Sequence, residues 1–305
     1  MPLHELPLER RTLHGHFSRD LEPVVTVDSG DTVAVSTPNA GWRVEPDAIP
    51  FEPRHPELDA GHALAGPIEV RGARAGDTLE VRIESVRVGS FGITTAAGWP
   101  TPLNDRLGVS DGDEVRLSWT LDPDDGVARD QRGRELRLRP FLGVLGMPPP
   151  EPGRHSTTPP RIWGGNIDCK ELVAGTTLLL PIPVDGALFS AGDPHGRQGD
   201  GEVSQLAIEC PLERAERTLT VRDDLPLRTP VGWTPEAWIA FGFDEDLDEA
   251  AAIAVDAMLE LMGRELGLER RDALALASLV VDLRVTQVVN QAKGVHAMLP
   301  HGAIR

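Results

Sequence analysis

The sequence has few features that would tie the protein to a disulfide framework or a membrane. Only two of its 305 residues are cysteines, Cys169 and Cys210, so a dense disulfide framework is excluded. No apolar run approaches the roughly 20 residues that cross a bilayer, and the charged first residues contain no apolar signal segment. We therefore expect a cytoplasmic protein with no membrane partner.

Basic residues are scarce as well. The chain has 30 Lys and Arg against 48 Asp and Glu, which gives a formal net charge of −18. A surface this acidic repels phosphate backbones, and no local cluster of Lys or Arg offsets the charge. Nucleic acid is therefore not an expected partner.

Short β-strands dominate the pattern up to about residue 225. Residues 24–35 read as a strand, a turn at Gly30 and a second strand, as in a hairpin. Residues 68–88 repeat this arrangement of turn glycines and alternating apolar positions, and so do two later segments, 108–122 and 172–184. Several short strands separated by turn signals are typical of a β-sandwich or barrel.

Helical patterns occur only near the carboxyl end. Apolar residues at three-to-four spacing predict one helix from Leu247 to Leu266 and a second from Arg271 to Val281. The last segment reads as a strand and then a loop, GVHAMLP, which either closes over the site or caps a sheet. We predict a mainly β fold with a smaller α/β carboxy-terminal portion. Residues 1–150 would form an amino-terminal β domain and residues 151–305 a portion that carries most of the site, the two making one functional unit.

The densest run of polar side chains lies between residues 164 and 209. It contains three pairs of residues two positions apart with glycines nearby, namely Asn166 with Asp168, Asp193 with His195, and Asp200 with Glu202. Residues two apart on a strand face the same side, so each pair can direct two side chains at one point. One imidazole with several carboxylates suits zinc or another divalent ion. Asp and Gly are equally typical of ordinary turns, so the spacing alone leaves both interpretations open.

Two other features belong to the same run. Glu209 ends an apolar stretch, which predicts a partly buried acid whose partner is either an arginine or a metal ion. Cys169, Lys170 and Glu171 are residue types found in nucleophilic amidases. Adjacent positions on a strand point to opposite faces, however, so these three side chains would not converge. We expect buried, unreactive thiols.

Several longer motifs resemble the acetamidase/formamidase family. The segments are GGNID and LPIPVDGALFSAGDPHGRQGDGEVSQLAIE in the middle, LEPVVTVDSGDTV and GHALAGPIEVRGARAGDTLEV before them, and VDLRVTQVVNQAKGVHAMLP at the end. The resemblance covers nearly the whole chain. It implies a β-rich fold and a divalent metal ion, with zinc as the first choice. It also implies hydrolysis of short linear amides to a carboxylate and ammonia by metal-activated water.

The resemblance also implies roles for individual residues. The positions that match metal ligands are His62, Asp168 and His195. Asp193 and Glu202 follow as catalytic residues, each a further ligand or a proton shuttle, and Asn166 as a catalytic hydrogen-bonding group.

The chain departs from the family pattern beside His62. Ala63 stands where the family usually has proline and Ala65 where it often has threonine, which leaves the identity of the amide open. We expect a homo-oligomer, a dimer or larger. The alternative function is a non-catalytic, metal-stabilised β-sandwich that binds a small ligand.

Overall fold

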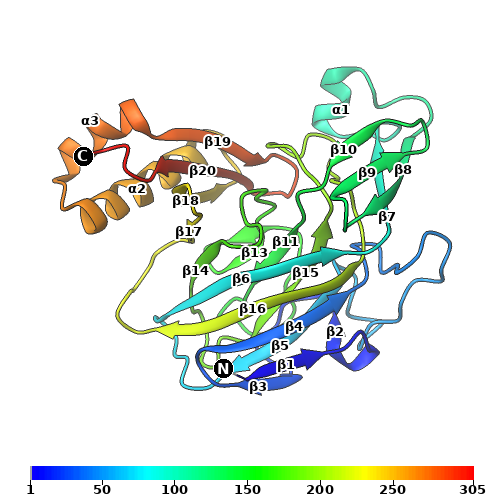
Figure 1. Cartoon of the computed structure of the whole chain (residues 1–305), viewed down its shortest axis with the longest axis horizontal. Coiled ribbons are helices and arrows are strands. Elements are labelled where there is room, and N and C mark those ends of the chain that lie inside the picture. Colours follow the sequence, from blue (N-terminus) through cyan, green and yellow to red (C-terminus); the bar gives the residue numbers. More distant parts are fainter. Residues whose placement is uncertain (1) are drawn as a thin grey trace.

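The computed structural model describes residues 2–305, and its strands form three sheets (Figure 1). The nine-stranded sheet has the order β1 (Leu3–Leu6), β4 (Asp31–Thr37), β16 (Leu212–Arg222), β6 (Thr78–Val88), β14 (Thr177–Pro181), β17 (Val231–Trp233), β18 (Ala237–Asp244), β20 (Lys293–Pro300) and β19 (Asp282–Gln287). The seven-stranded sheet has the order β12 (Pro160–Arg161), β13 (Gly164–Asn166), β11 (Phe141–Gly146), β15 (Phe189–His195), β5 (Leu64–Val70) and β2 (Leu13–His14), and β3 (Val25–Val27) also pairs with β5. The four-stranded sheet has the order β10 (Glu135–Arg137), β9 (Val127–Asp130), β8 (Val115–Asp122) and β7 (Phe91–Ala96).

The main core lies between the two larger sheets. Val33 and Leu219 contribute to it from the nine-stranded sheet, and Leu145 and Ala191 contribute from the seven-stranded sheet. All four side chains are at most 1% exposed. Alternating strand positions place these apolar residues on one face of each sheet, so the two faces exclude water from each other. The predicted mainly β sandwich is confirmed.

The first two predicted turns, in residues 24–35 and 68–88, connect strands of different sheets. β3 pairs with β5, whereas β4 pairs with β1 and β16, so the predicted hairpin at residues 24–35 is wrong in its pairing. Gly30 has φ +94°, a backbone conformation that glycine adopts without strain. β5 and β6 likewise belong to different sheets. A turn glycine between two segments of alternating polarity predicts the two strands. Which strands pair is decided by how each strand packs in the two layers of the sandwich.

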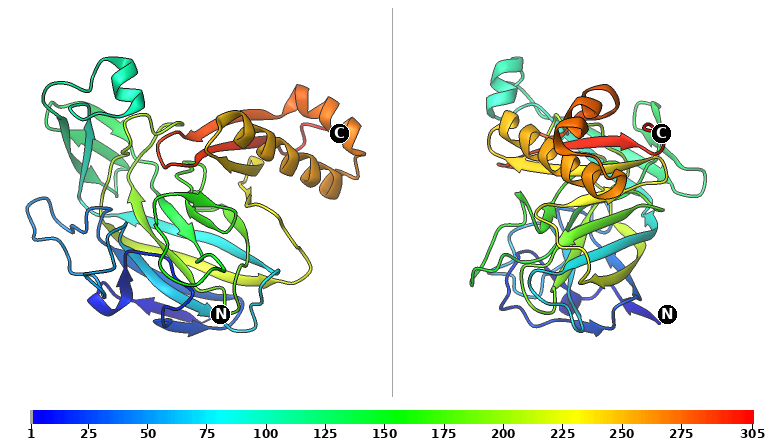
Figure 2. Two further views of the ribbon diagram at one scale, coloured as in Figure 1. Left: turned by 180° about the vertical axis from the view of Figure 1, so that it is seen from behind. Right: turned by 90° about the vertical axis from the view of Figure 1, so that its left-hand side faces the viewer.

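The two longest helices lie together at the carboxyl end, away from the amino terminus (Figure 2). The helix α2 (Leu247–Leu266) matches its prediction, with Asp246 accepting two backbone N–H groups at its start and Gly267 ending it at φ +67°. The helix α3 (Arg270–Val280) begins one residue earlier than predicted. Two short elements complete the set, the 3₁₀ helix η1 (Arg10–Thr12) and α1 (Pro102–Leu107). No helix among residues 2–305 has the length and apolar character that crossing a membrane requires.

The segment GVHAMLP is a strand and not the predicted loop. It forms most of β20, which pairs with β18 on one side and β19 on the other. Its alternating buried residues, Val295, Ala297 and Leu299, pack under α2 and α3. The predicted boundary at residue 150 stays a prediction, although strands from both sides of it share each larger sheet.

Candidate active site

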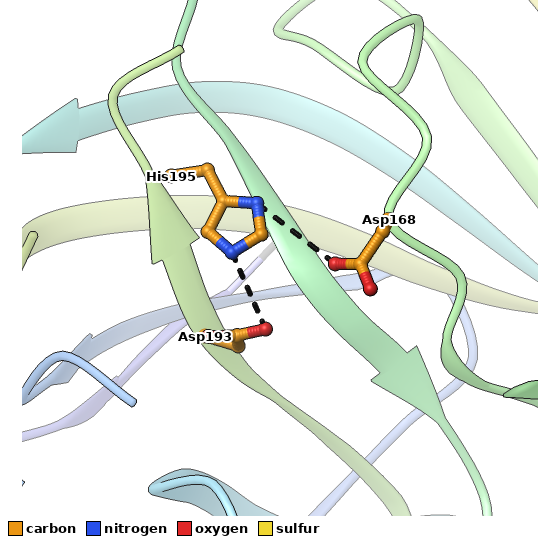
Figure 3. A group of neighbouring side chains, drawn as sticks. All are labelled: Asp168, Asp193 and His195. Atoms are coloured by element: carbon orange, nitrogen blue, oxygen red, sulfur yellow. Dashed lines mark ion pairs between the residues drawn. The ribbon is translucent and has the colours of Figure 1, made fainter. Parts of the chain in front are cut away.

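The strands on either side of β11, together with the loops that follow them, bring together the acids of residues 164–209. Asp193 and His195 lie at the end of β15, which pairs with β11 in antiparallel fashion (Figure 3). Asp168 follows β13, the other neighbour of β11, and its backbone N–H donates to the carbonyl of Gly143 at 3.2 Å. Because β13 and β15 both pair with β11, Asp168 comes close to Asp193 and His195. The sequence spacing had predicted only the pairs within each segment.

Four buried carboxylates surround one imidazole, and we call Asp168, Asp193, Glu202, Glu209 and His195 the carboxylate cluster. His195 Nε2 lies 3.4 Å from Asp193 Oδ2 and 3.3 Å from Glu209 Oε1, while Nδ1 lies 3.8 Å from Asp168 Oδ1. Within Asp168, Asp193 and His195, one ligand atom of each lies within 4.8 Å of the others, and the same holds for His195, Glu202 and Glu209. The arrangement can surround a cation.

Gln198 fixes which nitrogen of His195 faces the carboxylates. Its Nε2 donates to the backbone carbonyl of Asp168 at 2.8 Å, which leaves Oε1 to face His195 Nδ1 at 2.9 Å. A carbonyl oxygen only accepts, so Nδ1 donates. In neutral His195 the unprotonated nitrogen is then Nε2, which points toward Asp193 and Glu209. Orientation of an imidazole through its other nitrogen is usual for histidines that bind metals.

The carboxylate cluster leaves polar atoms without partners. Among the described residues, one oxygen of each acid is buried without a hydrogen bond: Asp168 Oδ1, Asp193 Oδ1, Glu202 Oε2 and Glu209 Oε2. Buried polar atoms are almost always paired, and each exception costs free energy. Buried acids that gather around one imidazole and each keep an unpaired oxygen fit a divalent cation.

Burial and mutual charge perturb the acids in opposite directions. Burial raises the pKa of Asp168 to about 6 and raises the pKa of Glu202 well above its ordinary value. Burial would also raise the pKa of Asp193, but the charges of His195 and His62 and the hydrogen bonds to His195 and Glu209 together outweigh it and lower this pKa to about 2. Burial would lower the pKa of His195, yet the charges of Glu209 and Asp193 raise it well above its ordinary value. Four acids thus share one imidazole, and the cluster has more acidic groups than its single basic group can balance.

The backbone at this cluster is strained, and Gly143 keeps its centre open. Asp168, Asp193 and Glu202 have φ values of 52°, 57° and 46°, in the left-handed region that residues other than glycine rarely adopt. Such strain is retained mainly where a site needs it. A Cβ on Gly143 would lie 2.5 Å from Asp193 Oδ2 and closer still to Asp168 Oδ1. A side chain here would therefore fill the space between the two carboxylates.

The remaining predicted residues lie around the carboxylate cluster. His62 lies two residues before β5, where Leu64 pairs with Gly192; a positive charge on His62 opposes the rise in the pKa of Asp168 and helps to lower that of Asp193. His62 Nδ1 contacts Thr157 Oγ1 at 2.8 Å, and His62 belongs to neither potential ligand group. Asn166 Oδ1 is buried without a hydrogen bond.

Three other positions of the run do not join the carboxylate cluster. Asp200 forms an ion pair with Lys170 at 2.7 Å, and Glu171 pairs with Arg139 and Arg284. Cys169 is fully buried, and burial raises the pKa of its thiol to about 12. The three consecutive side chains from Cys169 to Glu171 thus have separate surroundings, although they lie in a turn after β13 and not on the strand that the prediction assumed.

Sequence reasoning missed several residues that touch the cluster. Asn290 donates a short hydrogen bond to Asp168 Oδ2 from the turn between β19 and β20, 122 positions away. Gln198 and Gly143 were not singled out either. Glu209 was expected to need an arginine or a metal ion, and the structure places it beside His195. The position of Glu209 at the end of an apolar stretch was the only sequence signal for its place in the cluster.

The fold is that of solved acetamidases. The crystal structure of an acetamidase from Bacillus halodurans superposes with a TM-score of 0.84 at 29% identity, covering 97% of both chains. An acetamidase from Yersinia enterocolitica gives a TM-score of 0.85 at 26% identity, covering 100% of this chain and 94% of the other. A formamidase from Methylophilus methylotrophus is 25% identical over 242 residues, covering 63% of this chain and 60% of that relative.

These similarities define the class of the protein as an amidase. The match to a family profile identifies the family. The profile of the Acetamidase/Formamidase family matches residues 4–151 and 151–211, which is more than half of the chain. The protein belongs to this family. The resemblance noted in the sequence is therefore confirmed, and the non-catalytic alternative is not supported.

Proposed function

We propose that this amidase hydrolyses short linear primary amides, such as acetamide and formamide, to the carboxylate and ammonia with the help of a divalent metal ion. The names of its relatives support the substrate class. The observation that carries metal dependence is the set of four buried carboxylates around His195, each with one unpaired oxygen. Zinc is the first ion to test. A homo-oligomer and a cytoplasmic location stay predictions.

We assign the ion to His62, Asp168 and His195, with Asp193 as a further ligand. His195 would offer Nε2, because Gln198 holds Nδ1. His62 would likewise offer Nε2, because Nδ1 contacts Thr157. Asn290 would keep Asp168 directed at the site. A bound divalent ion would polarise the amide carbonyl and lower the pKa of the attacking water.

The protein's own residues would supply the proton transfers. Burial raises the pKa of Glu202 well above its ordinary value, which favours the protonated form of this acid. The acid can donate its proton to the amide nitrogen, which must be protonated before ammonia leaves. Asp193 is the second candidate for moving a proton, because its low pKa keeps it ionised. Asn166, with a free buried oxygen, would hold the amide N–H group.

Ammonia release from acetamide and formamide, with elemental analysis of the same sample, tests this function. Chelation should abolish activity and Zn²⁺ should restore it. His195→Ala should lose both metal and activity while keeping the wild-type circular dichroism spectrum. His55→Ala, at an exposed histidine, is the matched control.

Two results would contradict the assignment. Full activity of His195→Ala would remove the carboxylate cluster from the mechanism. Cys169→Ser should retain activity because its thiol is buried and protonated, and complete inactivation would instead point to a thiol nucleophile.

A further inference from the structure

A cavity of about 240 Å³ adjoins the carboxylate cluster. Glu202 and Gln198 line it, so the residue proposed to carry the proton and the residue that orients His195 both border this space. The other walls come from the four-stranded sheet and from the loop after β15. The cavity therefore lies beside the proposed reaction centre and borders it at Glu202.

The surface that this cavity presents is largely apolar. Its apolar side chains are Trp119, Leu136, Val203, Leu206, Ala207 and Ile208. The polar atoms of the four-stranded sheet are already engaged here, because Trp119 Nε1 donates to Thr94 Oγ1 at 3.1 Å and Thr94 Oγ1 donates to the carbonyl of Ala207 at 2.6 Å. At the rim, Arg197 donates to the carbonyl of Arg137 at 2.8 Å. Few polar groups are left to bind a polar ligand.

We propose that this cavity binds the acyl chain of the amide, and that the enzyme prefers aliphatic amides longer than acetamide. This inference rests on the proposed function. A primary amide carries only hydrogens on its nitrogen, so an apolar extension must come from the acyl carbon. The volume is below the roughly 300–1,000 Å³ of pockets for drug-sized ligands, which suits a chain of a few carbons.

The size of the expected effect follows from burial. Each buried methylene contributes roughly 0.8 kcal/mol, or about fourfold in kcat/KM when the contact is made in the transition state. The specificity constant should therefore rise about fourfold per carbon from acetamide onward, until the chain fills the cavity. Leu206 is the wall residue to change, because it is half-buried and outside the proposed reaction centre.

The experiment compares ammonia release from formamide, acetamide, butanamide and hexanamide by the metal-loaded wild-type protein and by Leu206→Ala. The variant should lose about tenfold in kcat/KM for hexanamide, since the contacts it removes equal the burial of between one and two methylenes of the substrate. The kcat/KM for formamide should stay unchanged. Leu274→Ala is the control, because Leu274 is 53% exposed on α3 and remote from the cavity lining. Hexanamide binding is measured in parallel by titration calorimetry.

Other outcomes separate this inference from the proposed function. Efficient hydrolysis with no dependence on chain length would overturn the acyl subsite and leave the amidase assignment intact. A preference for N-butylacetamide over hexanamide would overturn it too, because the cavity would then hold the leaving group. If no amide is hydrolysed, the proposed function fails. In that case, Leu206-dependent binding of hexanamide supports the subsite and lack of binding overturns it.

Discussion

Two regions of this amidase bury an aspartate against an imidazole, with opposite results. In the amino-terminal histidine cluster, formed by His14, His16 and Asp59, the aspartate is fully engaged. Asp59 Oδ1 accepts from Gly15 N at 2.7 Å and contacts His16 Nδ1 at 2.6 Å, and Oδ2 accepts from the backbone N–H of His55 at 2.8 Å. Burial would raise the pKa of Asp59, but these hydrogen bonds lower it.

The carboxylate cluster also places aspartates beside an imidazole, but it offers them too few hydrogen-bond donors. Asp168 keeps a buried, unpaired Oδ1, and burial raises its pKa to about 6. The number of donors around the carboxylate therefore distinguishes the two regions, whereas burial does not. A paired acid stabilises the fold, while a buried, unpaired acid fits a positive charge supplied from outside, as in the proposed metal site.

Matched substitutions of the two aspartates should have the largest effects and should separate activity from stability. We expect Asp168→Asn to lose bound metal and reduce ammonia release to background. Its metal-free stability should not fall, because it removes one of several buried like charges. Asp59→Asn should keep its activity below the melting temperature but lose about 2–4 kcal/mol of unfolding free energy, since it breaks a buried, charged network.

Urea unfolding of chelator-treated protein, combined with metal analysis and an ammonia assay, measures both properties. Comparable destabilisation by the two substitutions would contradict the comparison, since it would mean that Asp168 also serves the fold. Loss of metal from a fully folded Asp59→Asn variant would also contradict the comparison, since it would mean that Asp59 supports the metal site.

A smaller change, Gly143→Ala, tests the space between the carboxylates. The added Cβ would press on Asp168 and Asp193, so we expect metal affinity to fall by roughly 10–100-fold, as for changes in groups that position ligands. Competition with a chromophoric chelator measures this affinity. Gly199→Ala is the control, because a Cβ there would meet nothing within 4 Å. Equal affinity in the two variants would show that Gly143 only serves strand packing.

Local patterns in the sequence predicted the local parts of this structure. α2 was predicted to the residue because its apolar spacing lies between a capping aspartate, Asp246, and a terminating glycine, Gly267. Asp168, Asp193, His195 and Glu202 were found together because they occur in one short, glycine-rich run.

The parts that sequence reasoning missed depend on contacts between distant segments. Gly143 borders the site only because β11 pairs between β13 and β15, and Asn290 reaches it only because the turn between β19 and β20 is placed there. No local spacing encodes either contact. GVHAMLP was predicted as a loop because its glycine outweighed the alternation that makes it an inner strand of the nine-stranded sheet.

The smallest effect concerns pH and the amino-terminal histidine cluster. His14 Nδ1 donates to the carbonyl of His16 at 2.7 Å, and Nε2 accepts from Ser190 Oγ at 2.9 Å, so neutral His14 is fully paired. Burial lowers the pKa of His14 to about 4, against about 6.5 in the unfolded chain. Between these two pH values the unfolded chain binds a proton that the folded protein does not, so stability falls as the pH is lowered from about 6.5 to about 4.

His14→Gln removes this contribution while keeping a side chain that can donate and accept. At pH 7 we expect the variant to be less stable than the wild-type protein by about 1 kcal/mol, the usual net value of a buried hydrogen bond. At pH 5 the wild-type protein loses roughly 2 kcal/mol through His14, so the difference between the two proteins should shrink or change sign. Urea unfolding of the metal-free proteins at pH 7, 6 and 5 measures it, with His55→Gln as the exposed control. A difference that stays constant over this range would mean that His14 titrates alike in both states, and the amino-terminal cluster would then not depend on a neutral imidazole.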